Sequence, residues 1–195
     1  ESLRSEPIKE HTFWYQRGFT ENALKKYTEA RVSLEKAAAI KPEHFNTWLE
    51  LGFAATKLKL AEEAIAYFQK ALKIDAKSHI PYNGIGEVYR DVKKDMAIAK
   101  SWYQKTLNLN RTERKANYGM GYCLNSTKEY AEAIPYLETA ITSEPTYAAA
   151  FVELGYSLYK TGKPDLAIIK LLQAIKLSPQ NENARYYIAL IYRDK

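Results

Sequence analysis

The chain has 195 residues, of which 46% are hydrophobic, and this proportion allows a well-buried interior. It contains no apolar run long enough to cross a bilayer, so we expect no direct membrane insertion. The net charge of +6 comes from lysines that are scattered among acidic residues, a pattern that argues against nucleic-acid binding. The single cysteine, Cys123, excludes an internal disulfide and a cysteine-based zinc site.

Glycine and alanine recur along the chain at a fixed interval of 34 or 35 residues. The glycine column is Gly18, Gly52, Gly86, Gly121 and Gly155, and the alanine column is Ala30, Ala64, Ala99, Ala133 and Ala167. Self-similarity at this period is typical of a stacked repeat array. We therefore expect a single repeat domain over residues 11–195, after an N-terminal extension of residues 1–10. Its repeats are 11–44, 45–78, 79–113, 114–147 and 148–181, followed by a capping or truncated helix at 182–195.

Each repeat is predicted to form two helices joined by a short turn. In the second repeat, small and apolar residues recur at helical spacing in two sets: Trp48, Leu51, Gly52 and Ala55, and then Ala64, Phe68 and Ala71. A polar turn at residues 57–60 separates the sets. The third repeat has one extra residue, which we expect in its internal turn at 91–95 because loops absorb insertions at low cost.

The glycine column needs a physical reason, because glycine inside a helix costs about 1 kcal/mol relative to alanine. We expect Gly52 and Ala64 to let the two helices of a repeat approach closely, and Ala71 to do the same against the next repeat. A larger side chain at such a contact would overpack it, at a cost of about 1–3 kcal/mol.

These residues resemble the tetratricopeptide repeat family over nearly the whole chain, from residue 11 to residue 195. Counted within a repeat, the family pattern has an aromatic residue at position 4, Leu-Gly at 7–8, an aromatic residue or Leu at 11, Ala at 20 and 27, a bulky residue at 24, and Pro at 32. The fifth repeat matches it with Phe151, Leu154, Gly155, Leu158, Ala167, Leu171, Ala174 and Pro179. Local departures, such as Asn117 at position 4 of the fourth repeat, are expected to weaken single contacts only.

The resemblance implies an all-α fold, a right-handed superhelix whose concave groove is lined by the first helix of each pair. At 100° per residue, positions 2, 5, 9 and 12 share one side of that helix, and the packing positions share another. We therefore expect positions 2, 5, 9 and 12 to face a ligand.

Aromatic residues dominate this expected groove face. The candidate contacts for a partner are Tyr15, Phe19, Phe53, Asn83, Glu87, Arg90, Tyr118, Tyr122, Tyr156 and Tyr159. Tyrosine offers large contact area, little rotamer entropy to lose and a hydroxyl for peptide groups, which suits an extended segment or a helix of a partner protein. The alternative is that these rings pack only against neighbouring helices.

A second aromatic column, Tyr67, Trp102 and Tyr136, lies on the second helices. It is interpreted either as partly buried between repeats or as a second partner surface. The resemblance does not extend to the chaperone-binding carboxylate clamp of this family, because no repeat has Lys at position 5 with Asn at position 9.

No constellation for catalysis, a cofactor or a metal is recognisable. The segments Gly84-Ile85-Gly86 and Gly119-Met120-Gly121 lie inside predicted helices, without the strand and Gly-Lys-Ser of a phosphate loop. The three histidines, His11, His44 and His79, lack ligand spacing. We therefore expect neither enzymatic activity nor a cofactor in this chain.

The favoured function is a scaffold for protein–protein interaction. Two alternatives stay open: self-association through the last helix, whose apolar residues Ile188, Ala189 and Tyr192 lack a covering helix, or the regulatory arm of an enzyme whose catalytic domain lies outside a fragment. The compartment is also open between the cytoplasm, which we favour, and a bacterial envelope.

Overall fold

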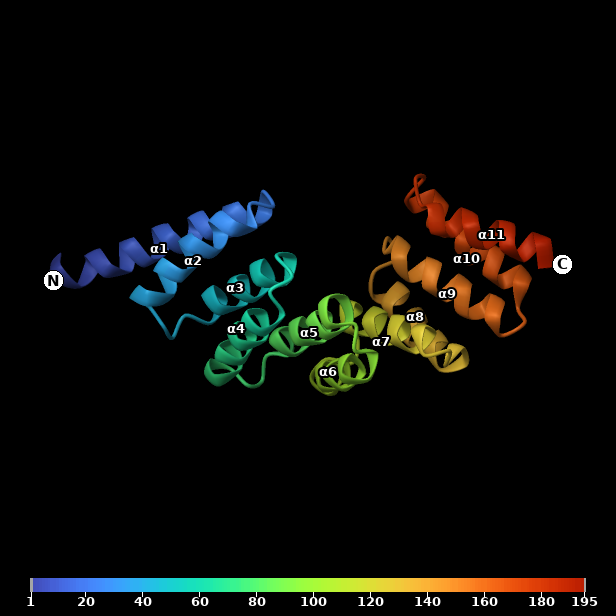
Figure 1. Cartoon of the computed structure of the whole chain (residues 1–195), viewed down its shortest axis with the longest axis horizontal. Helices are drawn as coiled ribbons and strands as arrows, with labels where there is room; N and C mark the ends of the chain where they lie inside the picture. The colour runs from blue at the N-terminus through green and yellow to red at the C-terminus, as the bar shows by residue number, and fades with distance from the viewer. Residues whose placement is uncertain (1, 195) are drawn as a thin grey trace. The chain divides into compact units, whose positions relative to one another are not determined.

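Paired helices follow one another along residues 2–194, the part of the chain that this computed structural model describes, with side chains from residue 8 onward (Figure 1). The described part consists of eleven α-helices and one π-helix and contains no strand. No helix within it is long and apolar enough to cross a bilayer. The expected all-α stack of helix pairs is thereby confirmed.

The helix pairs match the repeats that the sequence predicts. The helices are α1 (Ser2–Ala23) and α2 (Tyr27–Ile40); α3 (Phe45–Lys57) and α4 (Ala61–Ile74); α5 (His79–Glu87), which continues into the π-helix η1 (Val88–Lys93), and α6 (Met96–Leu109); α7 (Arg114–Ser126) and α8 (Tyr130–Ser143); α9 (Ala148–Lys160) and α10 (Pro164–Leu177); and α11 (Glu182–Asp194). Residues 2–10, expected as an extension, form the beginning of α1.

The chain divides into two compact units, Glu1–Asp95 and Met96–Lys195. Within the first unit, each helix from α1 to α5 packs against the next one along the chain. Within the second unit, the same nearest-neighbour packing runs from α6 to α11. A single domain over residues 11–195 stays a prediction.

The glycine column has the packing role that the sequence predicts. A Cβ atom on Gly52 would lie 2.5 Å from the ring of Phe68, and Phe68 itself is fully buried. Glycine at this position therefore lets α3 and α4 approach until a bulky side chain of α4 lies against the backbone of α3.

A second set of glycines lies against the aromatic residues at position 24. A Cβ atom on Gly84 would also lie 2.5 Å from Phe68, and one on Gly119 would lie 2.3 Å from Tyr103. These contacts account for the two Gly-x-Gly segments. The additional glycine in each makes room for a ring from the preceding repeat.

The extra residue of the third repeat is not in the internal turn, contrary to the sequence-based expectation. The first helix of that repeat ends instead in η1, and the turn that follows is only Lys94 and Asp95. A π-helix accommodates an additional residue within the helical chain by widening its last turn. The insertion therefore changes the end of the first helix, and with it the setting of Arg90.

Side chains at position 4 donate hydrogen bonds across the junction to the preceding repeat. Nε1 of Trp48 donates to the carbonyl of Pro42 at 2.6 Å, and Nδ2 of Asn117 donates to that of Arg111 at 2.9 Å. Asn117 was expected to weaken this contact. It lacks the aromatic ring but still donates the hydrogen bond across the junction. At these two junctions the side chain at position 4 therefore fixes the chain path between repeats.

Candidate partner-binding face

The predicted contact residues fall into two groups, one in each compact unit. The first unit holds Tyr15 and Phe19 on α1, Phe53 on α3, Asn83 and Glu87 on α5, and Arg90 on η1. The second unit holds Tyr118 and Tyr122 on α7, and Tyr156 and Tyr159 on α9. All ten belong to the first helices of their pairs.

Tyrosine rings line a hollow of about 280 Å³ in the second unit. Its lining residues, which define the tyrosine hollow, are Tyr122, Asn125, Ser126, Lys128, Tyr130, Glu153, Tyr156 and Tyr187. They come from α7, the turn after it, the start of α8, α9 and α11. Two residues that the sequence predicts, Tyr122 and Tyr156, are thus brought together at one site.

The rings of the tyrosine hollow support one another. Tyr156 stacks on Tyr187 with ring centres 4.8 Å apart, and Tyr130 meets Tyr156 edge to face at 5.6 Å. Such offset and edge-to-face arrangements are the favoured geometries of aromatic pairs. The lining is therefore held in place before any partner arrives.

The hydroxyl groups of these tyrosines are neutral donors. Burial raises the pKa of Tyr156, and its hydrogen bond with Tyr130 raises it further. Burial also raises the pKa of Tyr187, as does the nearby Glu153 carboxylate. Both phenols therefore stay protonated at physiological pH; the Tyr156 hydroxyl already donates to Tyr130, whereas that of Tyr187 can donate to a carbonyl oxygen.

An asparagine clamp ties α7 to α9 beside the tyrosine hollow. Nδ2 of Asn125 donates to the backbone carbonyl of Glu153 at 3.1 Å and to its Oε2 at 2.8 Å. The hydroxyl of Ser157 donates to Oδ1 of Asn125 at 2.7 Å. This amide is buried, so its polar atoms need these partners. The sequence-based interpretation missed Glu153 and Tyr187, although both occupy position 6 of their repeats.

The other two predicted residues of the second unit lie outside the lining. Tyr118 packs against Tyr122 and Tyr147, with ring centres 6.2 Å and 5.0 Å away. The hydroxyl of Tyr159 donates to the carboxylate of Asp194, which ties α9 to α11. Both therefore support the elements that form the tyrosine hollow.

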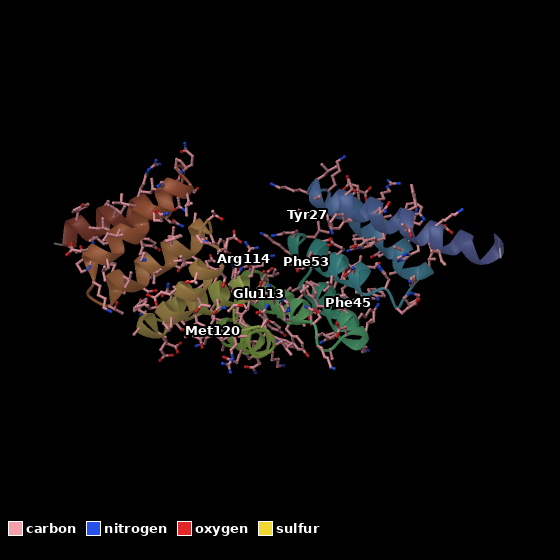
Figure 2. All side chains as sticks on the ribbon, turned by 180° about the vertical axis from the view of Figure 1, so that it is seen from behind. Tyr27, Phe45, Phe53, Glu113, Arg114 and Met120 are labelled. Atoms are coloured by element: carbon pink, nitrogen blue, oxygen red, sulfur yellow. The ribbon has the colours of Figure 1, made fainter. Side chains whose placement is uncertain are left out.

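The first unit presents phenylalanine where the second presents tyrosine. Phe19 is 50% exposed and packs against Tyr15 with ring centres 6.2 Å apart. Phe53, labelled in Figure 2, is half-buried and meets Phe68 edge to face at 5.4 Å. Tyr15 also packs edge to face on His44 at 4.9 Å.

The first unit has the same kind of clamp between α1 and α3. Nδ2 of Asn22 donates to the carbonyl of Glu50 at 3.1 Å and to its Oε2 at 2.8 Å. Burial raises the pKa of Glu50, and the hydrogen bond from Asn22 lowers it in part. Oδ1 of Asn22 is buried and has no hydrogen-bond partner among the described residues.

The expectation that position 5 faces a ligand does not hold in three repeats, where Leu49, Asn83 and Val152 are buried. Asn83 is only 5% exposed and donates to Oε1 of Glu87 at 3.0 Å. The helical wheel treats each helix alone and so does not include burial by other helices. Asn83 therefore lies beneath the surface.

Arg90 is committed to a neighbouring carboxylate. Its Nε and one terminal nitrogen each lie 2.7 Å from an oxygen of Asp91. Two parallel bonds of this kind fix the guanidinium plane. Arg90 could reach a partner only by exchanging this contact.

The histidines do not assemble a metal site within the described residues, where no three His, Cys, Asp or Glu side chains are grouped to hold a metal ion. His11 and His44 instead pack edge to face with ring centres 4.5 Å apart. Burial lowers the pKa of both imidazoles, so both are neutral at physiological pH.

Comparison with known proteins gives matches that cover most of the chain. Two family models, both described as "Tetratricopeptide repeat", match residues 22–84 and residues 126–182 and together span more than half of it. Anaphase-promoting complex subunit 3 of Schizosaccharomyces pombe is 24% identical over 167 residues, which are 86% of this chain and 25% of that protein. The chain spans about a quarter of the length of the first curated relatives that it matches.

Solved structures share the fold at low identity. The APC/C hetero-tetramer Cut9-Hcn1 gives a TM-score of 0.86 with 21% identity over 96% of this chain and 37% of that one. YrrB, described as a TPR protein with an unusual peptide-binding site, gives a TM-score of 0.65 with 19% identity over 89% of each chain. At these identities the similarity shows the fold alone.

Proposed function

Because the chain belongs to the tetratricopeptide repeat family, we propose that it is a protein–protein interaction scaffold whose tyrosine hollow binds an extended segment of a partner protein. The relatives support a scaffold role in general, and such scaffolds are generally not catalytic. The partner segment and its position on the chain are our proposal.

The convergence of four tyrosine rings on one hollow carries this proposal. Tyr122, Tyr130, Tyr156 and Tyr187 come from four different helices, so no single helix periodicity requires them to meet. Rigid aromatic rings bury large area on binding at low entropic cost, and the neutral hydroxyl of Tyr187 can donate to a backbone carbonyl of an extended chain. The peptide-binding site ascribed to YrrB is consistent with such a role.

The experiment that tests the proposal is quantitative capture of partners from the native lysate. Tyr122→Ala with Tyr156→Ala removes two rings from the hollow and leaves the Asn125 clamp intact. We expect at least a tenfold loss of the captured partner, because central aromatic anchors dominate binding at protein interfaces.

The matched control is Phe19→Ala with Phe53→Ala, which removes the corresponding rings of the first unit. Both variants are first checked for unchanged helicity by circular dichroism. Equal capture by the wild type and the tyrosine variant, or capture lost only in the phenylalanine variant, would contradict the proposal.

Self-association through α11 is a second candidate, favoured by the exposure of two rings on that helix. Tyr186 is 62% exposed and Tyr192 is 61% exposed. Exposed aromatic residues on one helix face are typical of surfaces that associate. Light scattering over a hundredfold range of concentration tests it, and a monomer throughout would contradict it.

A further inference from the structure

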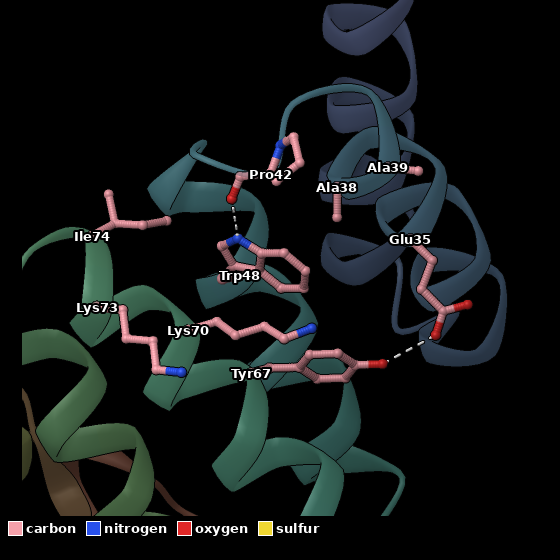
Figure 3. A pocket seen from close by; sticks show the side chains of 9 residues that line it. All are labelled: Glu35, Ala38, Ala39, Pro42, Trp48, Tyr67, Lys70, Lys73 and Ile74. Atoms are coloured by element: carbon pink, nitrogen blue, oxygen red, sulfur yellow. Dashed lines mark hydrogen bonds between the residues drawn. The ribbon is translucent and has the colours of Figure 1, made fainter.

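A second hollow, of about 630 Å³, lies in the first unit, where α2, α4 and the start of α3 meet (Figure 3). Its lining residues, which define the Trp48 hollow, are Glu35, Ala38, Ala39, Pro42, Trp48, Tyr67, Lys70, Lys73 and Ile74. Its size falls within the roughly 300–1,000 Å³ of typical ligand pockets. Apart from Trp48 and Pro42 it is formed by second helices, so it is separate from the face of the proposed function.

Hydrogen bonds at both ends hold the aromatic wall of this hollow. Figure 3 shows the indole of Trp48 bound to the carbonyl of Pro42 and the hydroxyl of Tyr67 bound to Glu35. The two rings are nearly parallel, with centres 6.0 Å apart. Burial and the bond to Glu35 raise the pKa of Tyr67 to about 12. The hollow therefore offers an apolar aromatic surface that is held in place at both ends.

The charges at the rim are unbalanced. The Glu35 carboxylate lies 3.3 Å from Nε of Arg31, which also pairs with Glu63 at 2.9 Å, and it accepts a hydrogen bond from Tyr67. Lys70 extends over the Trp48 ring, with Nζ 4.1 Å from the ring centre, and Lys73 lies one turn further along α4. Neither lysine forms an ion pair with any side chain that the structure describes. The rim therefore presents two positive charges without a carboxylate partner, of which that of Lys70 lies over the rings of Trp48 and Tyr67.

The corresponding hollow of the second unit shows that this lining is not a general consequence of the repeat. That hollow, between α6, α7 and α8, measures about 380 Å³. It has Asn117 at the place of Trp48, and Leu107 and Thr139 at the places of Ala38 and Lys70. This second hollow thus lacks the indole, the small floor residue and the lysine of the first, and keeps only Tyr136 at the place of Tyr67.

We propose that the Trp48 hollow binds a bulky apolar side chain of a partner protein segment that has carboxylates on both sides of that residue. The apolar side chain packs on Trp48, Ala39 and Ile74, where Ile74 is 41% exposed in the free chain. The flanking carboxylates pair with Lys70 and Lys73. An acidic segment fits the uncompensated rim, whereas a basic segment would meet two like charges.

The test uses fluorescein-labelled nine-residue peptides and fluorescence anisotropy. The panel has a central Leu, Met, Phe or Gly, flanked on both sides by Asp-Glu, Ser-Ser or Lys-Lys pairs. We expect the acidic peptides with a large central side chain to bind. Replacing the centre by Gly, or the flanks by Lys, should weaken binding at least tenfold.

Two variants, each with a matched control, locate the binding. Ala39→Leu fills the hollow from an exposed position, and its control is Asn108→Leu at the same place in the second hollow. Lys70→Glu with Lys73→Glu reverses the rim, and its control is Lys57→Glu with Lys176→Glu, which changes the net charge equally. We expect at least a tenfold loss in both test variants and less than a twofold change in both controls.

Any of four results would overturn this inference. The acidic peptides fail to bind at millimolar concentration, or the basic peptides bind more strongly than the acidic ones. Alternatively, Ala39→Leu leaves peptide binding unchanged, or a test variant and its control lose affinity equally. A dimer seen by light scattering and dissolved by Ala39→Leu would assign the hollow to a second copy of this chain instead.

Discussion

The two compact units carry the same asparagine clamp but surround it with different rings. Asn22 and Glu50 in the first unit correspond to Asn125 and Glu153 in the second, at a constant offset of 103 residues, and the bond lengths agree. Around the clamp, phenylalanine and glycine in the first unit stand where tyrosine stands in the second. The corresponding pairs are Phe19 and Tyr122, Phe53 and Tyr156, and Gly84 and Tyr187.

This difference separates what the repeat needs from what a partner would use. The clamp joins consecutive first helices in both units, so it belongs to the packing of the array. The aromatic rings differ between the two units, whereas the asparagine clamp is the same in both. We therefore assign partner binding to the tyrosines and not to the amide and carboxylate.

The difference also has a packing cause. Phe68 at position 24 lies against Gly84, whereas Leu171 is the residue that corresponds to it in the second unit. A large ring at position 24 thus accompanies glycine at position 6 of the next repeat, and the smaller leucine accompanies Tyr187. The lining of each unit is therefore coupled to its core.

The largest effect is expected when Gly84 of the first unit is replaced by tyrosine, the residue at the corresponding position 187 of the second unit. Gly84→Tyr would place a Cβ atom 2.5 Å from the Phe68 ring, so we expect a loss of about 3 kcal/mol in the free energy of unfolding. Urea unfolding followed by circular dichroism measures it. Phe68→Leu in the same chain should recover at least a third of that loss, because contacting sites are not additive. Additive losses would show that the two positions are independent.

A smaller effect is expected on breaking the clamps. Asn125→Ala removes the amide that bonds both the Glu153 carboxylate and the Ser157 hydroxyl, although Ser157 keeps its bond to the Glu153 carbonyl, so we expect a loss of about 2 kcal/mol. Asn22→Ala leaves only the Glu50 groups and should cost about 1 kcal/mol. The same urea titration compares them, and an equal or reversed order would contradict the stated role of Ser157.

A still smaller effect is expected when Ser157 is exchanged between units. Ala54 corresponds to Ser157, and without a hydroxyl there Oδ1 of Asn22 has no described partner. Ala54→Ser should therefore stabilise the first unit by about 0.5 kcal/mol, and Ser157→Ala should destabilise the second by about 1 kcal/mol. Thermal unfolding of both variants checks the two signs. A destabilising Ala54→Ser would show that the hydroxyl does not reach the amide.

The smallest effect is the dependence of stability on pH, which we expect in the first unit because His11 and His44 lie there. Burial lowers the pKa of His11 and His44, so the unfolded chain binds protons more readily than the folded one below pH 6.5. The stability of the first unit should thus fall as the pH drops from 7.5 to 5.5. His44→Tyr, which copies Tyr147 of the second unit, should reduce this fall in the thermal midpoint. An unchanged fall would exclude His44 as its source.

Much of the fold could be predicted from the sequence, because the 34-residue period constrains every repeat in the same way. The close approach of the two helices at Gly52 and Ala64 was expected from that period, whereas the contact of Gly52 with Phe68 comes from the structure. The π-helix could not be predicted. The spacing of the glycine and alanine columns shows that one residue is inserted between them, but it does not distinguish a longer loop from a wider helical turn. The change that the π-helix makes to the setting of Arg90 was therefore not predicted either.

The candidate site could be predicted only in part, for reasons of packing between repeats. Tyr122 and Tyr156 share position 9, so a single helical wheel finds them. Tyr187 and Glu153 occupy position 6, which faces the tyrosine hollow only because α7, α9 and α11 stack. Asn83 was assigned to the surface because the wheel does not include the neighbouring helices that bury it.

Amide hydrogen exchange of the chain with and without its captured partner tests the central claim most directly. The account predicts slower exchange on partner binding in α7, α9 and α11, around Tyr122, Tyr156 and Tyr187. Exchange in α1 and α3, which carry Phe19 and Phe53, should stay the same. Protection confined to the first unit or to the second helices of the pairs would contradict the assignment of partner binding to the tyrosine hollow.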